Sequence, residues 1–179
     1  TGAFTRFTLK TGAAHLFREP AAGFALRVAG PAGTSATALQ PRPEDGRLAA
    51  WSFAEAPAEA EFLFPWARLA WPAAATGGAR AALDARGPFV PHDLEASSLP
   101  LALFAWTLAN PGPERIAVTL LAHWPNMNGW FGRFGRGRPH RAGVGNFNEP
   151  VDHQALAAVR MGRVAAGEAT HEEGIGEMV

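Results

Sequence analysis

The strongest constraint on the fold comes from two apolar runs, residues 99–109 and 115–124, which flank an Asn-Pro-Gly-Pro sequence. Apolar runs around a loop rich in Pro and Gly are typical of a β-hairpin. Both faces of the first expected strand are apolar, with Leu99, Leu101 and Leu103 on one face and Phe104, Trp106 and Leu108 on the other. Because such a strand needs cover on both sides, we expect a β-sandwich with a further layer over it.

Shorter strand-like runs recur along the rest of the chain. Its 20 glycines and 15 prolines interrupt it often, which favours short strands over long helices. Further strands are expected at residues 24–29, 47–53, 62–71, 79–85 and 156–163. Only residues 54–61 and 149–161 could be helical. Pro57 argues against the first, and in the second we expect a loop followed by the strand at residues 156–163. The predicted fold class is all-β, a large antiparallel sandwich of two sheets.

Composition narrows the class of protein. A chain of 179 residues, 47% of them hydrophobic, is long and apolar enough for one globular domain. The net charge is zero, so nothing draws the whole molecule to nucleic acid or to an anionic membrane. With no cysteine, disulfides and thiolate metal sites are excluded, and we expect a reducing, cytoplasmic compartment. No run approaches the roughly 20 apolar residues of a transmembrane helix.

A long irregular stretch, residues 124–150, holds the candidate binding residues. Loops longer than about 12–15 residues in a compact domain are usually functional or disordered. Two Asn residues, Asn126 and Asn128, lie here between Trp124 and Trp130, among many glycines and several arginines. The alternative is that this loop only packs on itself.

Part of this stretch, residues 131–141, combines Arg with Gly and Phe. Its arginines are Arg133, Arg136, Arg138 and Arg141. Such a segment resembles those that bind RNA, because aromatic rings stack on bases and guanidinium groups contact phosphates. The neutral charge of the chain favours a docking loop whose arginines pair with carboxylates of a partner. We therefore expect no nucleic-acid partner.

No arrangement of polar residues in the sequence defines a catalytic site. Glycoside hydrolysis, for example, needs two carboxylates on either side of the scissile bond. The candidate carboxylates are Asp93, Glu95, Glu149 and Asp152, and no spacing among them indicates such a pair. A turn or cap role is the simpler interpretation of Asp93. The histidines form no metal-binding pattern, so we expect no metal in this chain. Because no pair of carboxylates can be assigned, we also expect no catalytic residue, and we expect no cofactor.

Several motifs follow one another in an informative order. RFTLKTG occupies residues 6–12, and the central motifs are Phe64-Pro65-Trp66-Ala67, Phe89-Val90-Pro91-His92-Asp93 and Ala96-Ser97-Ser98-Leu99-Pro100. Asn126 with Gly129, and then Asn148-Glu149-Pro150, complete the set. The ordered set resembles the N-terminal domain of glycoside hydrolase family 116, which includes bile-acid β-glucosidase and non-lysosomal glucosylceramidase. Two features depart from the family: Phe7 stands where Trp is expected, and the Arg-rich segment is not a hallmark.

The resemblance implies a fold and a parent enzyme. Residues 1–179 would be an N-terminal β-sandwich, partial at both ends, whose C-terminal partner is an (α/α)6 barrel that carries the catalytic Glu and Asp. The parent would be a retaining β-glucosidase acting on glucosides or glucosylceramide-type glycolipids through a glycosyl-enzyme intermediate. The signature residues with a structural role are Pro91, His92, Asp93, Ser97 and Ser98. The domain would also shape the mouth of the active site, where a Trp ring can stack on the apolar face of a sugar and an Asn side chain can donate to and accept from hydroxyls. The candidate substrate contacts are Trp124, Asn126, Asn128, Trp130 and Asn148. Alone, the chain is expected to be inactive.

Two alternatives to this function remain open at the level of sequence. One is a stand-alone β-sandwich that binds carbohydrate without a catalytic partner. The other is a nucleic-acid-binding module that uses the Arg/Gly segment.

Overall fold

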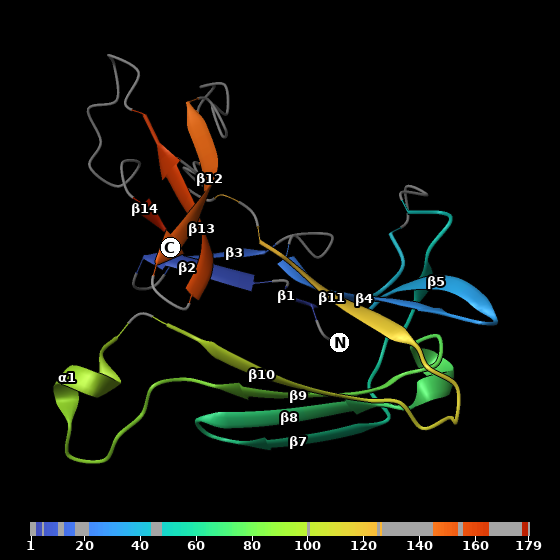
Figure 1. Ribbon diagram of the computed structural model, residues 1–179. Coiled ribbons are helices and arrows are strands. Elements are labelled where there is room, and N and C mark those ends of the chain that lie inside the picture. The colour runs from blue at the N-terminus through green and yellow to red at the C-terminus, as the bar shows by residue number, and fades with distance from the viewer. Residues whose placement is uncertain are drawn as a thin grey trace. The chain divides into compact units, whose positions relative to one another are not determined.

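The structure, a computed structural model, describes residues 3–4, 6–10, 13–16, 22–43, 48–99, 101–124, 126, 145–153, 156–164 and 177–178. Nearly all of their regular secondary structure is strand, so the all-β prediction is confirmed (Figure 1). The chain divides into two compact units, Thr1–His123 and Trp124–Val179. No helix among the described residues is long and apolar enough to cross a membrane.

The first unit contains two main sheets. The five-stranded sheet has the order β1-β4-β5-β6, with β11 also paired to β4. Its strands are β1 (Ala3–Phe4), β4 (Ala22–Gly30), β5 (Gly33–Ala38), β6 (Ser52–Phe53) and β11 (Ala117–His123). The four-stranded sheet consists of β10 (Leu103–Ala109), β9 (Arg80–Arg86), β8 (Trp66–Trp71) and β7 (Glu59–Leu63), in that order. Strands β2 (Arg6–Lys10) and β3 (Ala13–Leu16) form a separate pair.

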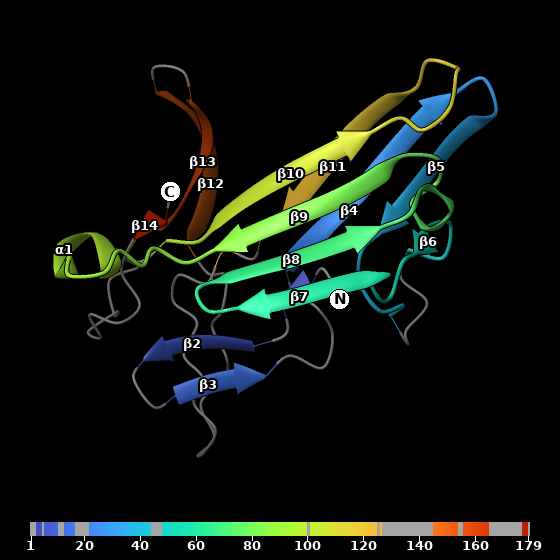
Figure 2. The same cartoon turned by 90° about the horizontal axis from the view of Figure 1, so that it is seen from below.

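All neighbouring strands pair antiparallel except β5 and β6, which are parallel. Figure 2 shows the four-stranded sheet from below, with its strands side by side from β10 to β7. A short 3-10 turn, Ala73–Ala75, joins β8 to β9, and the one-turn helix α1, Leu94–Ser97, lies between β9 and β10.

The two main sheets pack face to face around an aromatic core. Phe24 of β4 contacts Phe104 and Trp106 of β10, with ring centroids 5.4 and 5.0 Å apart. Trp71 of β8 stacks on Trp106 at 6.0 Å, and Leu26 is buried in the same cluster. Edge-to-face and offset contacts of this kind add to the burial of apolar area. The predicted two-sheet sandwich is therefore confirmed.

The expected hairpin between residues 99–109 and 115–124 is wrong. Strand β10 pairs with β9, whereas β11 pairs with β4 in the other sheet. Asn110 stabilises the loop that connects them: its side chain accepts from the amide of Gly112 at 3.1 Å and donates to the carbonyl of Glu114 at 2.7 Å. Facing sheets lie about 10 Å apart, and a loop of this length bridges them. The two runs therefore face each other across the core.

The further layer expected over β10 is not present among the described residues. Phe104, Trp106 and Leu108 point toward the core, while alternate residues of the strand are exposed. Leu103 remains 58% exposed on the outer face. The error came from starting the strand at Leu99, because the outer positions of the actual strand beyond Leu103 hold Ala and Thr.

The other expected elements agree to different degrees. Residues 24–29 lie within β4, residues 79–85 largely form β9, and residues 156–163 form a strand. The run at residues 62–71 is a hairpin that turns at Phe64-Pro65, which is a cis peptide. Strand was wrongly expected at residues 48–51, which form a turn and a bend. Residues 54–61 are not helical.

The second unit contains a three-stranded antiparallel sheet in the order β12-β13-β14. Its strands are β12 (Asn146–His153), β13 (Leu156–Arg163) and β14 (Glu177–Met178). We expected a loop up to residue 150 and again before residue 156. This prediction is wrong at residues 146–153, which form β12. Pro150 obscured this strand, but β12 is an edge strand, where proline is tolerated.

Candidate functional site

The Pro-rich elbow between β9 and β10 begins with a tight reversal. Val90 and Asp93 form an isolated bridge, and the Asp93 amide donates to the Val90 carbonyl at 3.1 Å. Between them, His92 adopts a φ of 65° after Pro91. Proline at the second position and a positive φ at the third are features of a type II turn. Pro91 and His92 therefore shape the backbone of the elbow.

Asp93 then begins helix α1. Its Oδ1 accepts a hydrogen bond from the amide of Ala96 at 2.8 Å, which makes it the N-cap residue of the helix. An N-cap carboxylate satisfies one of the donors that a helix start leaves without an internal partner. The Asp93 carboxylate therefore has a local structural task.

The two serines close the elbow. Ser97 Oγ accepts from the amide of Val90 at 2.9 Å and donates to its carbonyl at 3.0 Å. Ser98 Oγ donates to the carbonyl of Glu95 at 3.0 Å. The side chains of Asp93, Ser97 and Ser98 thus bond to the backbone of the elbow itself. Among the described residues of the elbow, neither serine is paired with a general base that could make it a nucleophile.

In the second unit, Asn126 is the centre of a polar cluster. Its Nδ2 donates to the carbonyls of Phe147 and Gly162, at 2.9 and 3.2 Å, and to Oδ1 of Asn148 at 2.9 Å. Asn146 Nδ2 donates in turn to the Asn126 carbonyl at 3.2 Å. An amide nitrogen has two hydrogens, so one of them is shared between acceptors. Asn126 therefore fastens both strands of the β12–β13 hairpin.

Asn148 receives its orientation from this cluster. Because its Oδ1 accepts from Asn126, its Nδ2 group points away from that contact. Asn148 is exposed, and among the described residues its Nδ2 has no acceptor. The Asn148 Nδ2 group on β12 therefore presents two outward N–H donors. Such donors are suited to binding a hydroxyl.

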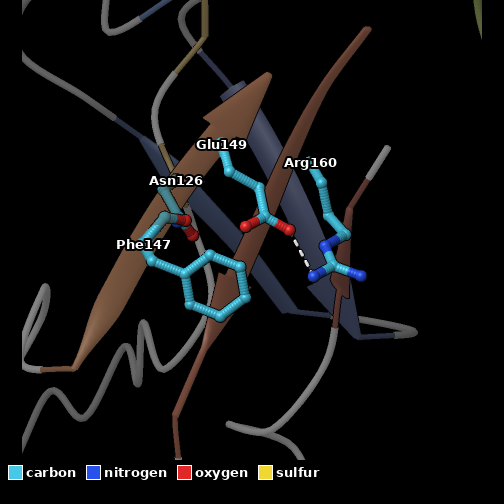
Figure 3. A network of polar contacts seen from close by, with 4 residues as sticks. All are labelled: Asn126, Phe147, Glu149 and Arg160. Carbon is cyan, nitrogen blue, oxygen red and sulfur yellow. Dashed lines mark hydrogen bonds and ion pairs between the residues drawn. The ribbon is translucent and has the colours of Figure 1, made fainter. Parts of the chain in front are cut away.

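The opposite face of the hairpin carries Phe147, Glu149 and Arg160. Glu149 and Arg160 are cross-strand partners and form an ion pair, and the Arg160 guanidinium lies 5.7 Å from the centre of the Phe147 ring (Figure 3). Figure 3 shows the Glu149 carboxylate directed toward Arg160 beside the Phe147 ring. The ring also covers Gly162, where an added Cβ would overlap it. Glu149 therefore neutralises a cation, a task that differs from that of a catalytic acid.

The structure places only some of the predicted substrate contacts. Asn126 and Asn148 are brought together, and Trp124 is 38% exposed two residues before Asn126. Asn128 and Trp130 lie outside the described residues, as does the Arg/Gly segment at residues 131–141. Among the described residues, no group of three His, Asp or Glu side chains could hold a metal ion.

Sequence reasoning missed Phe147, Arg160 and Gly162. The first lies in a segment that we took for loop, although Phe147 and Val151 alternate with polar residues as a strand requires. Arg160 and Gly162 acquire their partners through the register of β12 with β13. That register is not visible in either segment alone.

A sequence model of one protein family, described as beta-glucosidase 2, glycosyl-hydrolase family 116 N-term, matches residues 1–178. A search of curated proteins found no match.

Proposed function

Because the chain belongs to glycoside hydrolase family 116 as its N-terminal domain, we propose that it borders the active-site mouth of a retaining β-glucosidase. The observation that carries the proposal is the family match over residues 1–178. In this proposal the catalytic carboxylates belong to a C-terminal domain of the same polypeptide. The contacts of Asp93 and Glu149 agree with that assignment, because Asp93 caps helix α1 and Glu149 pairs with Arg160 within this domain.

The residue proposed to meet the substrate is Asn148. Its outward Nδ2 group would donate to a hydroxyl of the sugar or of the group attached to it, while Asn126 positions it. Trp124, with its partly exposed indole, and the predicted contacts Asn128 and Trp130 would extend this surface. Aromatic rings beside amide donors suit a glycoside, which has both apolar faces and hydroxyl edges.

The substrates proposed for the parent enzyme are β-glucosides, including glucosylceramide-type glycolipids. Hydrolysis would proceed by double displacement through a glycosyl-enzyme intermediate formed on the catalytic domain. The absence of cysteine from all 179 residues supports a reducing, cytoplasmic compartment.

Hydrolysis of a fluorogenic β-glucoside by the full-length enzyme tests this function. The full-length enzyme is expected to hydrolyse it, and the 179-residue chain alone is not. Asp93→Asn and Glu149→Gln should each keep kcat within about tenfold, because loss of a general acid or base typically costs 10²- to 10⁴-fold. Full-length protein that binds a glucoside but never hydrolyses it would replace this proposal with a carbohydrate-binding module.

A further inference from the structure

The outer face of the four-stranded sheet carries a row of charged side chains that projects away from the core. The strand register places Glu61, Arg68 and Asp84 side by side on β7, β8 and β9. Their neighbours along the strands, Leu69 and Leu83, are buried, so the charged side chains lie on the opposite face. Figure 2 looks onto this outer face, since β4 and β11 of the other sheet lie behind β8, β9 and β10.

Trp66 stands beside the charged row. It lies two residues before Arg68 on β8 and therefore on the same face of the sheet. Its Nε1 donates to Oδ1 of Asp84 at 3.0 Å, which directs the indole toward the row. Its cross-strand partner is Arg86, which is exposed. Among the described residues no guanidinium lies over the Trp66 ring, so a partly exposed ring is held in one orientation without a cation stacked on it.

The charged groups of this face keep unused hydrogen-bonding capacity. Among the described residues, Arg68 and Arg86 form no ion pair, and Oδ2 of Asp84 receives no hydrogen bond. A guanidinium group has five N–H donors, and each carboxylate oxygen is an acceptor. On the same face, Ala105 lies opposite Asp84 and Ala82 lies two residues before it, so only small side chains stand beside the row. The surface next to the ring is therefore flat and bordered by donors and acceptors.

The balance of charge on this face selects the kind of ligand. Two cations, Arg68 and Arg86, face two anions, Glu61 and Asp84, so a phosphate would meet carboxylates and a metal ion would meet guanidinium groups. A sugar uses both kinds of group, because its hydroxyls donate to carboxylates and accept from guanidinium groups while its apolar face stacks on an aromatic ring. We propose that these four residues and Trp66, here called the outer-face site, bind an extended, uncharged oligosaccharide.

The outer-face site goes beyond the proposed function and does not depend on it. Asn148, the residue proposed to meet the substrate, belongs to the second unit, whereas Trp66 and its neighbours belong to the first. The outer-face site holds a saccharide without cleaving it. Binding there therefore persists when the catalytic site is already occupied.

Calorimetric titration of the full-length enzyme tests the outer-face site. The catalytic site is first blocked by an activated fluoro-sugar, which leaves a long-lived glycosyl-enzyme in a retaining glucosidase. The probe is cellotetraose, a flat and uncharged oligosaccharide, and inorganic phosphate is titrated separately. Trp66→Ala removes the ring, and Arg68→Gln removes donors while keeping the ring. Arg27→Gln is the matched control, because Arg27 is an exposed arginine between the buried residues Leu26 and Val28 of the other sheet.

The blocked enzyme is expected to bind cellotetraose in preference to phosphate. Trp66→Ala and Arg68→Gln should each weaken this binding by about tenfold or more, as expected for the loss of a stacking ring or of charged hydrogen bonds. Arg27→Gln should leave it unchanged. The proposal is overturned if the blocked enzyme binds no cellotetraose, if it prefers phosphate, or if the three variants bind equally well.

Hydrolysis of a β-glucoside is measured on each sample before it is blocked, so that the two proposals are tested separately. An active enzyme that binds no cellotetraose once blocked refutes the outer-face site alone. A protein without hydrolysis whose cellotetraose binding is lost in Trp66→Ala and Arg68→Gln refutes the proposed function alone.

Discussion

The elbow of the first unit and the β12–β13 hairpin of the second use their polar residues in opposite ways. In the elbow, Asp93, Ser97 and Ser98 bond to backbone atoms three to seven residues away, and apolar side chains face outward. In the hairpin, Asn126 bonds to groups 21 to 36 residues away and leaves the Nδ2 of Asn148 exposed. A polar motif therefore indicates a binding surface only when its side chains are not already hydrogen-bonded to the backbone of the same segment.

The largest effect is expected where one side chain joins distant segments. Asn126→Asp replaces its donors with a carboxylate that faces three oxygen acceptors. We expect the free energy for opening the β12–β13 hairpin to fall by about 2–3 kcal/mol, because two partly buried carbonyls and the Asn148 Oδ1 lose their donor and face a negative charge instead. Hydrogen exchange of the β12 and β13 amides measures this change.

Asn110→Asp is the control for that variant, since Asn110 also donates to a carbonyl, but only four residues away in an exposed loop. Its effect should stay below about 1 kcal/mol. Equal effects of the two variants would remove the distinction between local and distant polar contacts.

A second effect tests the packing of the hairpin. In Gly162→Ala the new methyl group would overlap the Phe147 ring, which must move from its position. Overpacking of this kind costs about 1–3 kcal/mol. The loss is read from urea unfolding, and Gly112→Ala, where a Cβ meets nothing nearer than 3.6 Å, is the control. A neutral Gly162→Ala would mean that the ring does not rest on the strand.

A smaller effect is expected in the elbow. Asp93→Ala removes the N-cap of α1 and should cost about 1 kcal/mol, with faster exchange of the Ala96 amide. Asp93→Asn should preserve most of the stability, because asparagine caps helices as well as aspartate does. If both variants were equally harmful, the negative charge and not the cap would be what matters.

The smallest effect is expected for the ion pair of the hairpin. Both side chains are substantially exposed, so Arg160→Gln should lower the free energy of unfolding by about 0.2–1 kcal/mol, and by less in high salt. Urea unfolding at low and high ionic strength measures it. A larger, salt-independent loss would mean that the contact of Arg160 with the Phe147 ring is the main contribution.

Sequence predicted what depends on local pattern. Alternation and turn residues identified β4, β9 and β13, and the type of residue at Asp93 suggested a cap. The partner of β10 could not be predicted in this way, because the choice of sheet is made by packing of Phe104 and Trp106 against Phe24. The partners of Asn126 depend in the same way on the register of two strands.

The most direct test of the account is the kinetics of Asn148→Asp in the full-length enzyme. This change keeps an oxygen that accepts from Asn126 but removes the outward donors. With a glucoside that carries a bulky aglycone, KM should rise about fivefold, the value of one hydrogen bond of about 1 kcal/mol, while kcat and the KM for a small glucoside stay unchanged. Asp152→Asn, a change at an exposed position of the same strand, should alter neither constant. An equal loss of kcat on both glucosides, or no change in any constant, would contradict the proposal that Asn148 borders the substrate mouth.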